Sequence, residues 1–156
     1  MIKFIKYFAI ISFCLTTNAI ALIEIDITEG NREPLPIAIS NFFYDEVDSL
    51  KLSEISNNLS DVVKADLERC GLFTPINKDA FIQKNSAMHL RPRFEDWRLI
   101  KSQALVTGKL KIVDEDKLRV EFRLWDTLAE KEIEALVLIT TLDNWRRISH
   151  MISDKV

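Results

Sequence analysis

Two stretches of alternating side chains, separated by a short charged connection, constrain the fold of this chain more than any other feature. Small or apolar residues occupy every second position in 104–112 and again in 118–124. This period of two is typical of strands with one buried face, and the polar residues 114–117 between the stretches predict a hairpin turn. A third strand is expected over 133–142. Three consecutive strands of this kind leave an apolar face that helices must cover.

A helical period replaces the strand period in the middle of the chain. From Ser53 to Leu67, apolar residues recur at intervals of three and four, and Gly71 is the expected left-handed residue just after the helix. A second helix is predicted over 94–101, with Trp97 facing inward.

Shorter elements complete the predicted order. A last helix should follow Asp143, whose carboxylate is placed to cap it, and should carry Ile148 and Ile152 on one face. Brief extended segments are expected at 37–39 and 73–76, and a helical piece is expected at 79–83. The sequence therefore predicts an α+β fold, a mixed β-sheet with helices packed on one face. We assign it to a single domain over 34–156.

The first 21 residues have the pattern of a cleavable export signal. Two lysines precede an apolar run over 8–15, and Ala19 and Ala21 supply the small-x-small pattern that signal peptidase accepts. The run is shorter than the roughly 20 residues that cross a bilayer, which makes an uncleaved anchor the weaker alternative. We expect cleavage after Ala21 and export of the mature protein.

Charge and cysteine content narrow the classes of function. Removal of residues 1–21 leaves 19 basic and 24 acidic side chains, a net charge of about −5 with no basic cluster, which argues against nucleic-acid binding. Cys70 is then the remaining cysteine, so no internal disulfide can form. Its position after Val63 and Leu67 predicts a small, buried core residue that reacts slowly with thiol reagents.

The mature chain is expected to begin with a strand-like segment, 22–33, that stands apart from the domain. From Ile23 to Thr28, isoleucines alternate with polar residues. The residues we expect to bind a partner are Leu22, Ile23, Glu24, Ile25, Asp26, Ile27, Thr28 and Glu29. Two interpretations remain open. The segment is either a permanent strand of its own sheet or a strand that adds to the sheet edge of another protein.

Catalytic and ligand-binding patterns are missing from the sequence. His89 and His150 are far apart, and neither has a second ligand at metal-binding spacing. Three glycines cannot build a phosphate-binding loop, and the acidic run 114–116 lacks the remaining ligands of a calcium loop. We therefore expect no enzymatic activity, no cofactor, no metal and no small-molecule substrate.

Five segments, in this order and spacing, resemble the N-terminal domain of the TolB family, the soluble periplasmic component of the Tol–Pal system of Gram-negative envelopes. They are IEIDITEGNREPLPIAISNF (23–42), SDVVKADLERCGLFTPI (60–76), ALVTGKLKI (104–112), LRVEFRLWDT (118–127) and NWRRISHMISDKV (144–156). The most specific pieces are the A-D-L-x-x-x-G-x-F motif that contains Asp66 and Gly71, and the V-x-G motif of Val106 and Gly108. We interpret these residues as structural.

The resemblance implies a partner for the opening segment. In the TolB family the first residues of the mature protein engage the inner-membrane protein TolA, so residues 22–29 are expected to bind a TolA-like partner. The family also continues into a β-propeller that contacts the lipoprotein Pal. Because no blade-like repeats precede Val156, Pal binding is not carried over.

The resemblance thus indicates a periplasmic protein-interaction module of the Tol–Pal system, with roles in envelope integrity, outer-membrane constriction at cell division and protein import. Two alternatives stay open: an α+β adaptor of outer-membrane assembly, or a TolB remnant without activity. Fold alone does not decide among them.

Overall fold

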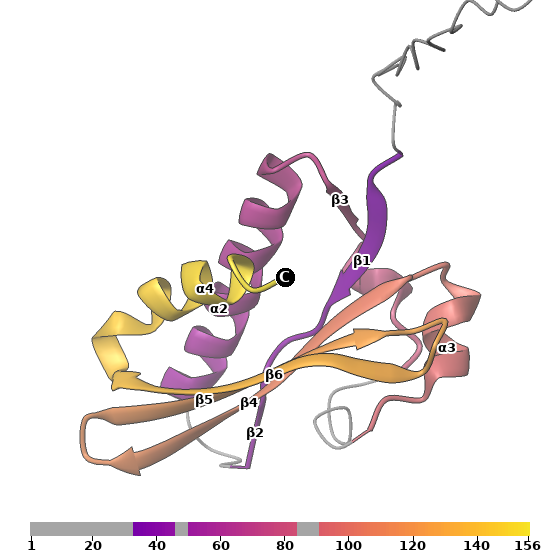
Figure 1. Cartoon of the computed structure of the whole chain (residues 1–156). Helices are drawn as coiled ribbons and strands as arrows, with labels where there is room; N and C mark the ends of the chain where they lie inside the picture. Colours follow the sequence, from indigo (N-terminus) through magenta and orange to yellow (C-terminus); the bar gives the residue numbers. More distant parts are fainter. Residues whose placement is uncertain (1–32, 46–49, 84–90) are drawn as a thin grey trace, which may run out of the picture. The chain divides into compact units, whose positions relative to one another are not determined.

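The computed structural model describes residues 33–45, 50–83 and 91–156 (Figure 1). Within these ranges, strands and helices follow in an α+β order. The elements are β1 (Leu35–Ile39), β2 (Phe43–Tyr44), α2 (Leu50–Arg69), β3 (Phe73–Pro75), η1 (Lys78–Ala80), α3 (Phe94–Leu99), β4 (Ala104–Asp114), β5 (Lys117–Asp126), β6 (Lys131–Thr141), η3 (Leu142–Asn144) and α4 (Trp145–Ser153).

The strands form one mixed six-stranded sheet in the order β3-β1-β4-β5-β6, and β2 pairs separately with β4. Strand β1 is parallel to both β3 and β4, whereas β4, β5 and β6 are antiparallel neighbours. The predicted three-strand meander is therefore confirmed, and its turn at Glu115 and Asp116 lies where the charged connection was expected. The mixed-sheet α+β class is also confirmed.

Helix α2 starts three residues before Ser53, where the predicted helical pattern begins, and it ends at Arg69, close to the predicted end at Gly71. Its buried face contains the apolar residues spaced at three and four, including Leu52, Leu59 and Val63. Gly71 has φ +75°, the left-handed conformation that suits glycine after a helix. The chain can therefore reverse into β3 directly after α2.

The main core lies between the sheet and the two helices α2 and α4 (Figure 1). Alternate residues of β4 and β5 face this core, among them Val106, Leu110, Val120 and Phe122. Because all four are fully or almost fully buried, the predicted strand register is correct. Ser56, also buried, donates its hydroxyl hydrogen bond to the Phe42 carbonyl at 2.7 Å, so its polar group is satisfied.

A second, smaller core lies on the other side of the sheet. Ala38 alternates with the inward residues Ile37 and Ile39, and it packs with Leu105, Trp125 and the α3 residues Phe94 and Trp97. The Trp125 indole donates to the Thr107 hydroxyl at 2.9 Å within this layer. The prediction placed the helices on one face of the sheet. This holds for α2 and α4, but α3 lies on the opposite face, where Trp97 packs against Ala38 and Leu105.

Other local predictions need correction. Asp143 does not cap α4: a 3-10 turn, Leu142–Asn144, intervenes, and Asn144 precedes the helix without a side-chain hydrogen bond. The extended segment expected at 37–39 starts earlier than predicted, since β1 begins at Leu35, although its pairing with β4 begins at Ile37. Strand β2 was not predicted, because two residues carry no period. The helical piece expected at 79–83 is a 3-10 turn over Lys78–Ala80.

Within residues 33–45, 50–83 and 91–156, no helix is both long and apolar enough to cross a membrane. The apolar run at 8–15 and His89 lie outside the described residues.

Candidate functional site

The residues that the sequence singled out as a binding segment lie outside the described part of the chain. This applies to the cleavage positions Ala19 and Ala21 and to all of Leu22–Glu29. The described domain begins at Glu33, which is exposed, and enters the sheet at Leu35. Strand β1 is held on both sides, by β3 and β4. The predicted segment therefore precedes a central strand of the sheet.

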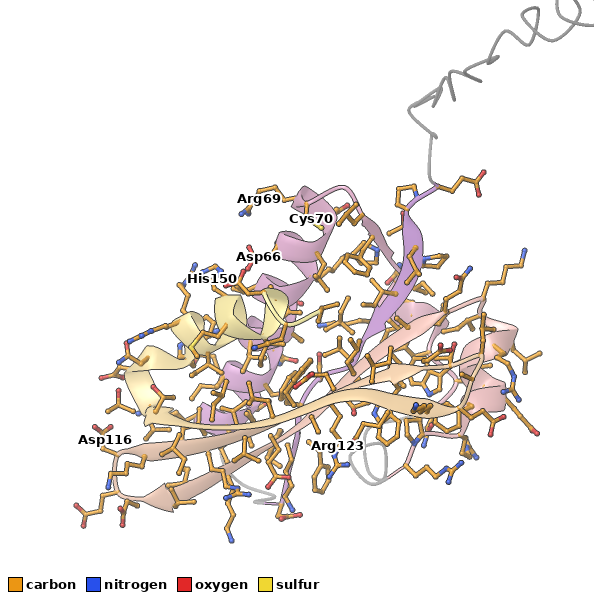
Figure 2. All side chains as sticks on the ribbon, viewed as in Figure 1. Asp66, Arg69, Cys70, Asp116, Arg123 and His150 are labelled. Carbon is orange, nitrogen blue, oxygen red and sulfur yellow. The ribbon has the colours of Figure 1, made fainter. Side chains whose placement is uncertain are left out.

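A carboxylate–imidazole contact connects the two long helices of the described domain. Asp66 of α2 lies 2.6 Å from Nδ1 of His150 in α4, and its other oxygen accepts a hydrogen bond from Arg69 at 3.3 Å. Figure 2 shows these three side chains together where α2 and α4 meet. The side chain of Asp66 is 15% exposed and that of His150 is 51% exposed. The sequence predicted a structural role for Asp66, and the structure shows that role as a contact between two helices.

A hollow of about 440 Å³ lies beside this contact. Its wall contains polar residues and apolar residues from α2, from the start of β3 and from the C-terminal segment: Asp66, Leu67, Cys70, Leu72, Phe73, His150, Ser153, Asp154 and Val156. The prediction of a buried Cys70 is wrong, since the residue is exposed. Helix α2 ends at Arg69, so Cys70 lies in the turn before Gly71 and does not belong to the buried apolar face of the helix. Its thiol donates to the Leu67 carbonyl at 3.0 Å.

The chemistry of this hollow is limited by the partners that its groups already have. Nδ1 of His150 faces Asp66, and the thiol hydrogen bond of Cys70 goes to a backbone carbonyl. No group of three metal-ligating side chains with suitable geometry occurs in the described ranges. What the geometry supports here is a link between α2 and α4.

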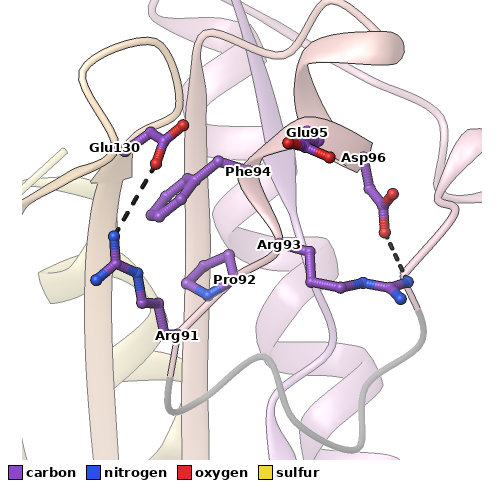
Figure 3. A pocket seen from close by; sticks show the side chains of 7 residues that line it. All are labelled: Arg91, Pro92, Arg93, Phe94, Glu95, Asp96 and Glu130. Carbon is purple, nitrogen blue, oxygen red and sulfur yellow. Dashed lines mark ion pairs between the residues drawn. The ribbon is translucent and has the colours of Figure 1, made fainter.

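A second hollow, of about 400 Å³, lies at the start of α3 and combines arginines with carboxylates (Figure 3). Arg93 Nη2 lies 2.6 Å from Asp96 Oδ2, an ion-pair distance, although this oxygen has no well-directed hydrogen bond. Arg91 lies 4.0 Å from Glu130, which also accepts a hydrogen bond from Arg98 at 2.6 Å. Each positive charge is matched by a neighbouring carboxylate, so this hollow has little surplus charge for an anion.

A third hollow, of about 250 Å³, is mainly apolar and includes Leu35, the first residue of β1. Leu128 and Ile133 form part of its wall, and both side chains are exposed. Phe73 and Val156 line this hollow and also the one beside Cys70. The surface around the start of β1 is therefore apolar. None of the three hollows was predicted from the sequence, because each one joins residues that are far apart in the chain.

Comparison with known proteins gives a consistent result. The family model described as the TolB amino-terminal domain matches residues 23–133. The Tol-Pal system protein TolB of Pelagibacter ubique (strain HTCC1062) is 49% identical over 158 aligned residues, which cover 97% of this chain and 35% of that protein. The chain thus spans about a third of the length of this relative.

Solved structures agree with the family match. A crystal structure of TolB from Acinetobacter baumannii superposes with a TM-score of 0.61 at 26% identity, covering 78% of this chain and 27% of that one. Lipoprotein GNA1162 from Neisseria meningitidis gives a TM-score of 0.54 at 14% identity, covering 69% and 81% of the two chains. At that identity the second likeness concerns the fold alone.

Proposed function

The chain belongs to the TolB amino-terminal domain family, and from this premise we propose that it is an exported protein-interaction module of the Tol–Pal type. The family match begins at Ile23, so it includes the alternating segment as well as the folded domain. This observation carries the proposal. The segment Leu22–Glu29 binds a TolA-like inner-membrane protein, and the domain from Glu33 onward holds the segment in the periplasm.

The chemistry of the segment suits strand addition. Three isoleucines share one face of an extended chain, and acidic or hydroxyl side chains share the other. Backbone hydrogen bonds to an exposed sheet edge supply affinity, and the alternating side chains set the register. An acidic outer face favours a partner with basic residues beside that edge.

The described domain has a core of its own, which is consistent with a folded domain that carries a separate binding segment. Its main core is built by β1, α2, β4, β5 and α4, and residues such as Ile37, Leu59 and Ile152 are completely buried there. Two of the described hollows contain paired charges or apolar walls, and in the third the His150 ring and the Cys70 thiol already have hydrogen-bond partners. We therefore assign the function to binding. Contributions to constriction, envelope integrity and import follow from this role.

Deletion of residues 22–32 tests the proposal. The expected product keeps its fold, because the main core is formed by elements from β1 onward, but it loses binding to the carboxy-terminal domain of TolA. Circular dichroism measures the fold, and isothermal titration calorimetry measures binding. Two matched variants separate the faces of the segment: Ile25→Ser removes an apolar contact and should weaken binding, whereas Thr28→Ser keeps the polar face and should not.

Two outcomes would contradict this reasoning. A deletion product that is unfolded would mean that the isoleucines belong to a permanent strand, since burial of each contributes roughly 1.5–3 kcal/mol. A folded product that binds TolA as well as the intact chain does would assign binding to another surface.

A further inference from the structure

The two edges of the sheet differ strongly within the described residues. One edge is β3, which has three residues and includes Pro75, a residue that cannot donate a hydrogen bond to a neighbouring strand. The other edge is β6, which has 11 residues and pairs on one side with β5. Figure 1 shows β6 extending along the full length of the β4–β5 hairpin. The β3 edge is thus short and protected, and the β6 edge is long.

Most of β6 has none of the features that prevent edge-to-edge association. The seven residues 135–141 contain no charge, no proline and no glycine. The irregularity in the β5–β6 pairing lies between Leu124 and Trp125, opposite Glu132–Glu134, so it twists the start of the strand rather than this run. Natural sheets normally interrupt such an edge with lysine, proline or a bulge. The run 135–141 is therefore able to accept another strand.

An exposed apolar row accompanies this free edge. Val137 and Ile139 are 47% and 62% exposed, and they lie opposite Glu121 and Arg119 of β5, on the face away from the main core. Leu136 and Leu138, which alternate with them, pack against the core. A strand added beside β6 would place its own side chains next to Val137 and Ile139 on one face and next to Leu136 and Leu138 on the other, and would thus extend both apolar surfaces.

We propose that β6 pairs in antiparallel orientation with β6 of a second copy of this chain, about a two-fold axis at Val137. The pairing is self-complementary because the central seven residues are uncharged, so no like charges meet near the axis. Val137 of one copy lies opposite Val137 of the other, and Ala135 of each copy lies opposite Ile139 of the other. The two sheets join into one.

Charge at the ends of the strand favours a second copy as the occupant. Glu134 is exposed, and no ion pair or hydrogen bond involves its side chain in the described part of the chain. Antiparallel pairing brings it toward the end of the other β6, which the 3-10 turn Leu142–Asn144 connects to the exposed Arg146 and Arg147 of α4. Arg146 also lies over the ring of Trp145. Asp143 lies at the same end and offsets one of these charges. With Lys131 and Glu132 counted, residues 131–134 have a net charge of −1, and residues 143–147 have a net charge of +1, so the two ends that meet are opposite in net charge.

Sedimentation equilibrium of the exported protein over about 1–500 µM, a range in which weak dimers dissociate, tests the proposal. A monomer–dimer equilibrium is expected. Val137→Lys places two ammonium groups opposite each other at the axis and should raise the dimer dissociation constant at least about tenfold. Leu99→Lys is the matched control: Leu99 is 74% exposed on α3, and its replacement should leave the equilibrium unchanged. Thermal melts of both variants confirm that the fold is intact.

A cysteine pair tests the axis itself. In a background with Cys14→Ser and Cys70→Ser, Val137→Cys should form an intermolecular disulfide on mild oxidation, because directly paired strand residues have Cα atoms within bonding range. Ile139→Cys should not, since the two copies of residue 139 lie about 13 Å apart along the strands. A protein that is monomeric throughout, a dimer unaffected by Val137→Lys, or crosslinking at 139 in place of 137 overturns the proposal.

Discussion

Gly108→Ala is the substitution whose cost the structure determines most directly. Gly108 lies in the middle of β4, directly opposite Phe122 of β5. A Cβ atom added there would lie well under 3.0 Å from two ring atoms of Phe42 and from the backbone carbonyl oxygen of Glu121. Real Cβ atoms essentially never approach other heavy atoms so closely. The V-x-G motif therefore has a steric reason: the Phe42 ring occupies the space of a side chain.

The magnitude follows from how little these neighbours can move. Phe42 has no exposed surface, and Gly108 lies on the side of β4 that faces the main core. Overpacking of a close-packed interior usually costs about 1–3 kcal/mol, and a clash that involves both a buried ring and a paired backbone belongs at the upper end or above it. We expect a loss of about 3 kcal/mol or more. For a domain of this size the melting temperature should fall by roughly 10 °C.

Urea unfolding, followed by circular dichroism and by tryptophan fluorescence, measures this loss. A double-mutant cycle with Phe42→Ala identifies the cause: without the ring, Gly108→Ala should cost markedly less, although the Glu121 carbonyl retains part of the penalty. Gly71→Ala is the contrasting control. No atom lies within 4 Å of a Cβ at Gly71, so its cost, about 1 kcal/mol, comes from the positive φ alone and should be independent of Phe42.

Two results would contradict the steric explanation: a cost of Gly108→Ala below about 1 kcal/mol, or a cost that is the same with and without the Phe42 ring within about 0.5 kcal/mol. Either result would mean that the ring does not lie over the glycine.

Two further predictions concern cysteine reactivity and export. Because Cys70 is exposed, the thiol of the native protein should react with a thiol reagent nearly as fast as a small thiol does. Cys70→Ser should change the free energy of unfolding by less than about 0.5 kcal/mol. Strongly retarded labelling would mean that the Cys70 side chain is buried. Mass spectrometry of periplasmic protein should find Leu22 at the amino terminus, because Ala19 and Ala21 fit the peptidase groove; intact residues 1–21 in the membrane fraction would disprove cleavage.

Local periodicity was sufficient for the main elements. The three- and four-residue spacing from Ser53 predicted α2, and the alternation in β4 and β5 predicted which residues face the core, such as Val106 and Phe122. Gly71 marked the helix end because its left-handed φ is a local requirement. These features depend on residues a few positions apart, whose geometry a helix or strand determines by itself. Residues 22–29 were also predicted from alternation, but they lie outside the described residues, and their binding role is a proposal that rests on the family resemblance.

Tertiary structure decided which surfaces meet. Alternation shows that a strand has an apolar face but not which neighbour covers it, so the position of β1 between β3 and β4 and the packing of α3 opposite α2 were not predictable. Asp66 and His150 are 84 residues apart in the chain, and neither local pattern indicates the other. The exposure of Cys70 depends on where α2 ends against its neighbours, and the need for glycine at 108 depends on a ring 66 residues earlier. Each of these facts is a contact between distant segments, and such contacts arise only when the whole core packs together.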